Sequence, residues 1–140
     1  MTRIIGGEAQ LTREDFCDLS KSTGLLLPSE FVDFYLENNG GYPDVDPGGV
    51  NPLLLNCFLL IRYGDVTIGA AYQALVRSNP ALDGCIPFAY DDSGNIFLLS
   101  AKADETGVIY LWFPDEGELE TIFGSFTEFL RALLNGQEDT

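Results

Sequence analysis

The chain has 140 residues, of which 22 are acidic and 7 are basic, and its formal net charge is −15 at pH 7. This length suits one domain with one core, and a hydrophobic content of 46% is too apolar for a disordered chain. So negative a charge argues against binding to nucleic acid or to an anionic membrane, and it favours either a solubilising role or a basic partner.

The first two predicted elements are helices, each recognised by its ends. The first runs from about Arg13 to Ser22, with Thr12 as its N-cap and Asp15 in the capping-box position. The second begins near Pro28, whose missing N–H costs nothing in a first helical turn, and it stops at Asn39-Gly40-Gly41. Its apolar residues share one side, and the acidic residues of the other side are Glu30, Asp33 and Glu37.

The middle of the chain predicts a loop, a strand and a helix. Prolines and glycines between Tyr42 and Pro52 exclude a regular element there. The apolar run from Leu53 to Tyr63 predicts a strand. Residues Asp65 to about Arg77 have helical spacing, and Asn79-Pro80 ends that helix.

Three strands follow, joined by tight turns. Cys85 to Tyr90 and Asn95 to Ser100 flank the turn Asp91–Gly94, which predicts a hairpin. Val108 to Phe113 has the β-branched and aromatic content of a third strand. The acidic stretch Asp115 to Glu120 is predicted as a loop or a short edge strand.

The last predicted element is a helix that begins near Ser125, with Glu128 completing a second capping-box pattern. Consecutive strands joined by tight turns imply an antiparallel sheet. The sequence therefore predicts a single domain over residues 1–140, of the α+β class, with about four helices packed on a sheet that includes a C-terminal meander.

Histidine is absent from the chain, which excludes Ser-His-Asp and Cys-His catalysis and zinc sites of the Cys-His type. The three cysteines, Cys17, Cys57 and Cys85, form no C-x-x-C pattern, and their apolar neighbours predict buried, reduced thiols. We therefore expect a cytoplasmic protein without a signal peptide or a membrane span. We also expect no cofactor and no metal.

Acidic pairs leave a carboxylate-based hydrolase as the least favoured alternative, because chance alone produces pairs among 22 acids. The segment Asp91–Asn95 resembles a calcium loop only faintly, since Lys102 stands where the last acidic ligand is needed. A tight turn explains it better. The pair Gly40-Gly41 lacks the Lys-Ser/Thr of a nucleotide loop.

Four stretches together resemble the SUKH superfamily, over residues Leu11 to Leu134. These stretches are Leu27–Phe31 leading to Asn38–Pro43, Ile86–Asn95, Gly107–Trp112 and Ser125–Leu130. The superfamily includes bacterial immunity proteins and a fungal regulator of cell-wall glucan synthesis. The resemblance implies an α+β fold without catalytic residues, and a bacterial member typically neutralises a toxin of the nuclease or deaminase type.

The acidic residues are unevenly distributed. Residues Ala103 to Thr140 hold nine acidic residues and one basic residue, Arg131. A nuclease toxin carries a basic surface, which an acidic protein can cover. We expect the contact at Asp91, Asp92, Asp115, Glu116, Glu118, Glu120, Asp44 and Asp46. A regulatory or scaffolding protein with a host partner is the main alternative, and a merely solvated acidic surface also remains open.

Overall fold

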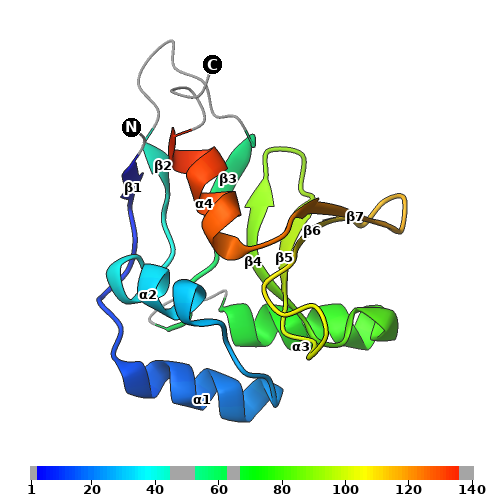
Figure 1. Ribbon diagram of the computed structural model, residues 1–140, viewed down its shortest axis with the longest axis horizontal. Coiled ribbons are helices and arrows are strands. Elements are labelled where there is room, and N and C mark those ends of the chain that lie inside the picture. The colour runs from blue at the N-terminus through cyan, green and yellow to red at the C-terminus, as the bar shows by residue number, and fades with distance from the viewer. Residues whose placement is uncertain (1–2, 45–52, 63–66, 136–140) are drawn as a thin grey trace.

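A computed structural model describes residues 3–44, 53–62 and 67–135 (Figure 1). The elements are β1 (Arg3–Ile5), α1 (Arg13–Thr23), α2 (Ser29–Glu37), β2 (Tyr42–Asp44), β3 (Leu55–Phe58), α3 (Ile68–Ser78), a 3-10 turn (Pro80–Leu82), β4 (Cys85–Asp91), β5 (Ile96–Ser100), β6 (Ile109–Phe113), β7 (Glu118–Phe123) and α4 (Phe126–Asn135). Strands β3 to β7 form an antiparallel sheet in chain order, and β1 pairs with β2 in a second antiparallel sheet. The predicted α+β class is confirmed.

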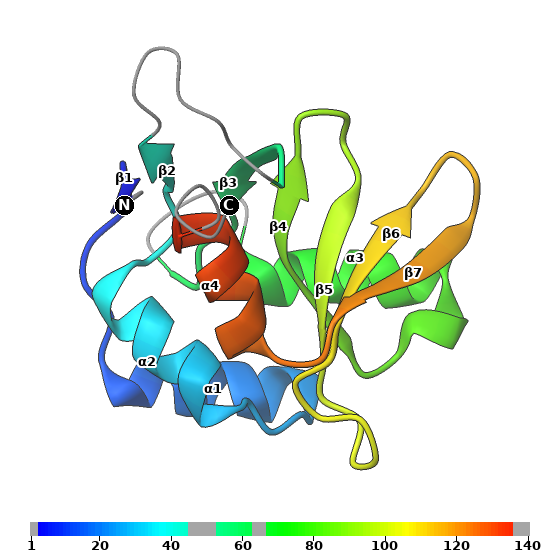
Figure 2. The same cartoon turned by 45° about the horizontal axis from the view of Figure 1, so that its top comes forward.

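Helices cover both faces of the five-stranded sheet, with α2 and α4 on one face and α3 on the other (Figure 2). On β5, Phe97 and Leu99 belong to the larger core cluster, which includes residues of α2 and α4. Leu98 lies between them and packs in a second cluster with Leu75 of α3. This double burial explains why β5 is apolar from Ile96 to Leu99 instead of alternating between apolar and polar residues.

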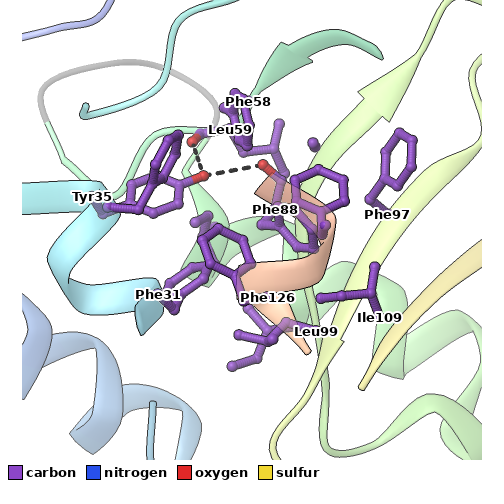
Figure 3. Close-up of a cluster of buried hydrophobic side chains, with 14 of the residues drawn as sticks. Phe31, Tyr35, Phe58, Leu59, Phe88, Phe97, Leu99, Ile109 and Phe126 are labelled. Atoms are coloured by element: carbon purple, nitrogen blue, oxygen red, sulfur yellow. Dashed lines mark hydrogen bonds between the residues drawn. The ribbon is translucent and has the colours of Figure 1, made fainter. Parts of the chain in front are cut away.

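Aromatic rings fill the space between the sheet and the helices α2 and α4 (Figure 3). The ring of Phe88 on β4 has its centroid 5.2 Å from that of Phe129 and 5.5 Å from that of Phe126, both on α4. Tyr35 of α2 is fully buried, and its hydroxyl is 2.8 Å from the carbonyl oxygen of Leu59 and 3.1 Å from that of Phe88. Burial raises the pKa of this hydroxyl, so it stays protonated and donates.

Strands β1 and β2 correct the prediction for the region after α2. Residues Tyr42–Asp44 were expected in a loop, but Tyr42 pairs with Ile5 and Asp44 with Arg3. Two strands of three residues, far apart in the sequence, are too short to show an alternating pattern. The remainder of the predicted loop, including Asp46, lies outside the described residues.

Three predicted element boundaries are wrong or untested. The strand expected over Leu53–Tyr63 is confined to Leu55–Phe58, and Tyr63 lies outside the described residues. The helix expected from Asp65 is α3, which begins at Ile68, and Asp65 lies outside the described residues. Its N-cap is Thr67, whose hydroxyl oxygen accepts the N–H of Ala70 at 3.3 Å. Pro28 precedes α2 as its N-cap, with φ −61° and ψ 147°, and does not lie in its first turn.

The cysteines are all free, but they are not all buried as predicted. Cys85 is buried, Cys57 is half-buried and Cys17 is exposed. The buried side of α1 carries Phe16 and Leu19, and Cys17 lies on another side of this helix. The burial of the neighbouring Phe16 therefore does not imply the burial of Cys17.

Candidate protein-binding surface

Four of the eight carboxylates predicted to bind a partner lie on the β6–β7 hairpin. Its turn, residues 114–117, places Gly117 at φ 67°, and the Gly117 N–H donates to the Phe113 carbonyl at 2.8 Å. Glycine takes this left-handed conformation at no steric cost. We call the four carboxylates of this turn and of β7 the acidic hairpin: Asp115, Glu116, Glu118 and Glu120.

The acidic hairpin is exposed at all four positions. Glu118 pairs with Phe113 and Glu120 with Leu111, so the two glutamates point to the same face of the sheet. β7 is the last strand of its sheet, and its outer edge has no strand partner in the described chain. None of the four carboxylates has a hydrogen-bond or ion-pair partner within residues 3–44, 53–62 and 67–135.

The turn between β4 and β5 separates two acids that the sequence placed together. Asp91 is 9% exposed, and its carboxylate accepts the N–H of Ser93 at 2.9 Å, the N–H of Asn95 at 2.9 Å and the Asn95 amide at 3.0 Å. These bonds hold the turn. Asp92 is exposed and accepts the amide of Asn56 at 3.1 Å, so only Asp92 of this pair is open to solvent.

Asp44 lies apart from the acidic hairpin. It ends β2, is half-buried and stands opposite Arg3 in the β1–β2 ladder. β2 and the β6–β7 hairpin are at opposite sides of the molecule in both views (Figures 1 and 2). The seven predicted residues that the structure describes therefore do not form one continuous surface: the structure brings four of them together, and Asp46 lies outside the described residues.

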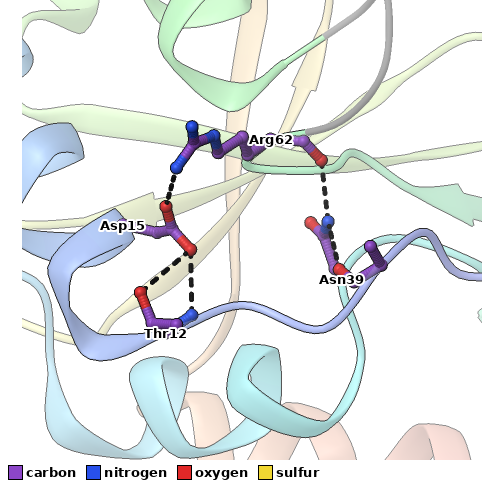
Figure 4. Close-up of polar contacts among 5 residues, drawn as sticks. Thr12, Asp15, Asn39 and Arg62 are labelled. Carbon is purple, nitrogen blue, oxygen red and sulfur yellow. Dashed lines mark hydrogen bonds and ion pairs between the residues drawn. The ribbon is translucent and has the colours of Figure 1, made fainter.

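A polar network that sequence reasoning missed ties the N-terminal segment to the residues after β3 (Figure 4). The Asn39 amide donates to the carbonyl oxygens of Ala9 at 3.1 Å and Arg62 at 2.7 Å, and its oxygen accepts the N–H of Ile61 at 2.9 Å. Asn39 is 3% exposed. The sequence shows it only as a helix stop, because its three partners come from distant segments.

Asp15 is the charged centre of the same region. Its carboxylate accepts the backbone N–H of Thr12 at 2.9 Å, which confirms the predicted capping box, and it pairs with the Arg62 guanidinium at 2.8 Å. These two bonds, the first above all, hold the pKa of Asp15 below its usual value. Asp15 stays ionised near neutral pH and so cannot serve as a general acid.

We expect Asp15→Asn to destabilise the fold by about 1–3 kcal/mol at pH 7, because a neutral amide accepts the Thr12 N–H more weakly and cannot form the ion pair with Arg62. A lowered folded pKa contributes stability that is present above the unfolded value of about 3.9 and is lost as the pH falls through the folded value. The difference from the wild type should therefore shrink in acid. Urea unfolding at pH 7 and pH 3 measures it, with the exposed Asp18→Asn of the same helix as control. A difference that does not change with pH contradicts this role.

The hydrolase alternative requires two carboxylates on opposite sides of a cleft. No three His, Cys, Asp or Glu side chains within residues 3–44, 53–62 and 67–135 are grouped to hold a metal ion. The groove between α2 and α4 has three carboxylates, but all of them project from α2; its other lining residues are Ile4, Phe34, Asn38, Thr127, Leu130 and Leu134. Two carboxylates do not face each other across this groove, as a glycosidase mechanism requires.

Comparison with known proteins identifies the family. The model of the SMI1/KNR4 family (SUKH-1) matches residues 10–132, which span α1, α2, the five-stranded sheet, α3 and most of α4. Among curated proteins, no relative matches the chain. In the described part of the chain, every helix is too short or too polar to cross a membrane. The extent of the family match shows that the chain belongs to the SMI1/KNR4 family (SUKH-1).

Proposed function

We propose that this protein is a non-enzymatic binding module that neutralises a toxin domain, of the nuclease or deaminase type, by covering a basic surface with its acidic hairpin. Family membership supports a protein-binding role, of the immunity or the regulatory kind. The observation that carries the proposal is the acidic hairpin itself. Its four exposed carboxylates lie close in sequence, and no lysine or arginine occurs between Lys102 and Arg131.

Clustered carboxylates that have no ion-pair partner in the described chain repel one another, and so they do not stabilise the free protein. A basic protein surface converts the same cluster into an attraction. Complementary charge of this kind accelerates association and selects against wrong partners more than it adds raw affinity. A toxin that binds a phosphate backbone presents such a basic surface, and a protein bound to that surface also excludes the nucleic acid.

The free thiols fit the same role inside a cell. Cys17 and Cys57 are free and at least partly exposed, and a reducing compartment would keep such thiols reduced. A toxin delivered from outside or made in the same cell acts in that compartment, and we place the protein there.

Co-expression tests the proposal. The chain is produced in a sensitive host together with the toxin domain encoded beside its gene, and with an unrelated toxin as control. Survival is expected with the neighbouring toxin only. Cell death despite soluble expression of both proteins refutes the immunity role. A stable complex with a host protein in a pull-down, without any toxin beside the gene, instead favours the regulatory alternative.

A further inference from the structure

A groove with an apolar floor and an acidic rim separates α2 from α4. Its volume is about 700 Å³. The floor is formed by Ile4 of β1, Phe34 of α2, and Leu130 and Leu134 of α4. The rim on the α2 side carries Glu30, Asp33 and Glu37.

The groove follows from how the two helices pack. Phe31 and Phe34 of α2 lie against Phe126 at the start of α4, with ring centroids 5.3 Å and 5.6 Å apart. α4 then presents one stripe to the core and a neighbouring stripe to the groove. Leu130 and Leu134 of this second stripe are only half-buried, so apolar surface stays open to solvent.

The carboxylates of α2 repel one another in the free protein, although the helix dipole favours Glu30 in the first turn. Glu30, Asp33 and Glu37 lie three and four residues apart, so neighbouring pairs repel each other on the helix surface. Glu37 also lies in the last turn, where the helix dipole disfavours a negative charge. α2 contains no lysine or arginine that would offset them. A bound cation would add attractive interactions that offset these repulsions.

We propose that the α2–α4 groove binds a cationic amphipathic segment of a partner protein. Apolar side chains of that segment rest on Phe34, Leu130 and Leu134, and its lysines or arginines meet the acidic rim. The volume suits a few inserted side chains. The proposal rests on the proposed function only in requiring a protein partner, and the groove is separate from the acidic hairpin.

Charge favours a cationic segment over the other possible occupants of the groove. A second copy of the chain also carries −15 and is repelled. A neutral apolar ligand makes no use of three carboxylates, and an acidic segment is repelled by them. A cationic segment with an apolar stripe is complementary to both the rim and the floor.

The test uses a short leucine–lysine peptide whose leucines repeat at helical spacing, and a scrambled peptide of the same composition. Fluorescence anisotropy measures both affinities for the whole chain. We expect the amphipathic peptide to bind at least about tenfold more tightly, because a −15 protein attracts both peptides but only one matches the floor. Amide chemical-shift changes are expected around Phe34 and Leu130. Equal binding of the two peptides overturns the proposal.

Two pairs of variants separate the groove from general acidity. The first pair compares Glu30→Gln, Asp33→Asn and Glu37→Gln with an equally charged control, Glu14→Gln, Asp18→Asn and Asp104→Asn, whose sites are exposed elsewhere. The groove variant should lose about tenfold in affinity and the control much less. Equal losses contradict the proposal.

The second pair adds one positive charge to the exposed helix positions Thr127, beside the groove, or Ala74, on α3. Thr127→Lys should weaken peptide binding several-fold more than Ala74→Lys. Equal effects of the two lysines count against the groove. Because the toxin is absent from these measurements, their failure would leave the proposed function standing, and failure of the co-expression test would leave the groove standing.

Discussion

Reversing the charge of the acidic hairpin is expected to abolish protection against the partner toxin and to slow complex formation by about 100-fold or more at low salt. The variant replaces four exposed residues by lysine: Asp115→Lys, Glu116→Lys, Glu118→Lys and Glu120→Lys. An attractive surface then becomes a repulsive one. The association rate, measured by stopped-flow fluorescence at low and high salt, should depend strongly on salt in the wild type and lose that dependence in the variant.

The fold should tolerate these changes. None of the four carboxylates has a partner in the described chain, and all four are exposed. The cross-strand pair Trp112–Leu119 and the Gly117 turn, which shape the hairpin, remain in place. An unchanged thermal midpoint, measured by circular dichroism, establishes that any loss of binding arises at the surface.

A charge-matched control shows whether the loss of protection depends on the position of the reversed charges or only on the total charge of the protein. Four reversals bring the formal net charge from −15 to −7, wherever they are made. The control therefore carries lysine at four other exposed acidic positions: Glu8, Glu14, Asp18 and Asp104. It should keep protection and most of the association rate. If the control fails as completely as the hairpin variant, the acidic hairpin is not the contact.

Most elements after Arg13 were predictable because their signals are local. Capping boxes at Thr12 and Ser125 mark helix starts in the sequence, and Asp15 accepts the Thr12 N–H as predicted. At α4, Ser125 accepts the N–H of Glu128 at 3.1 Å, but the Glu128 carboxylate accepts the N–H of Gly124 at 3.0 Å instead of that of Ser125. The turn between β4 and β5 is likewise predicted by four adjacent residues, Asp91 to Gly94. β1 and β2 went unpredicted because their pairing is non-local, and Pro43 in β2 argues against a strand unless the strand is at an edge.

The candidate site was predictable in composition but not in geometry. The sequence identifies Asp91 and Asp115 as equivalent acids near turns. Only the structure shows that three donors occupy the Asp91 carboxylate, whereas Asp115 is open. Glu30, Asp33 and Glu37 were correctly placed opposite the apolar side of α2. That they face a groove depends on where α4 lies, and no local pattern encodes the packing of two helices distant in sequence.

The position of α4 in turn depends on Phe88, and we expect Phe88→Ala to destabilise the fold by about 3–5 kcal/mol, a large part of the whole stability of a domain. Phe88 is fully buried at the centre of β4. Its ring contacts aromatic rings from both helices and from the adjacent strands: Phe31, Phe58, Phe97, Phe126 and Phe129. Truncation leaves a cavity among rings that cannot all move inward, because each is held by its own neighbours.

Urea unfolding of Phe88→Ala should be compared with Phe113→Ala, the same truncation at a half-buried residue of the β6–β7 hairpin. Phe113 belongs to neither core cluster, so its loss should cost less than about 1.5 kcal/mol. Equal costs contradict a core centred on Phe88. If Phe88→Ala still folds, we expect it to weaken peptide binding in the groove more than toxin binding at the hairpin. Phe88 contacts rings of α2 and α4, which form the groove, but it does not contact the hairpin turn.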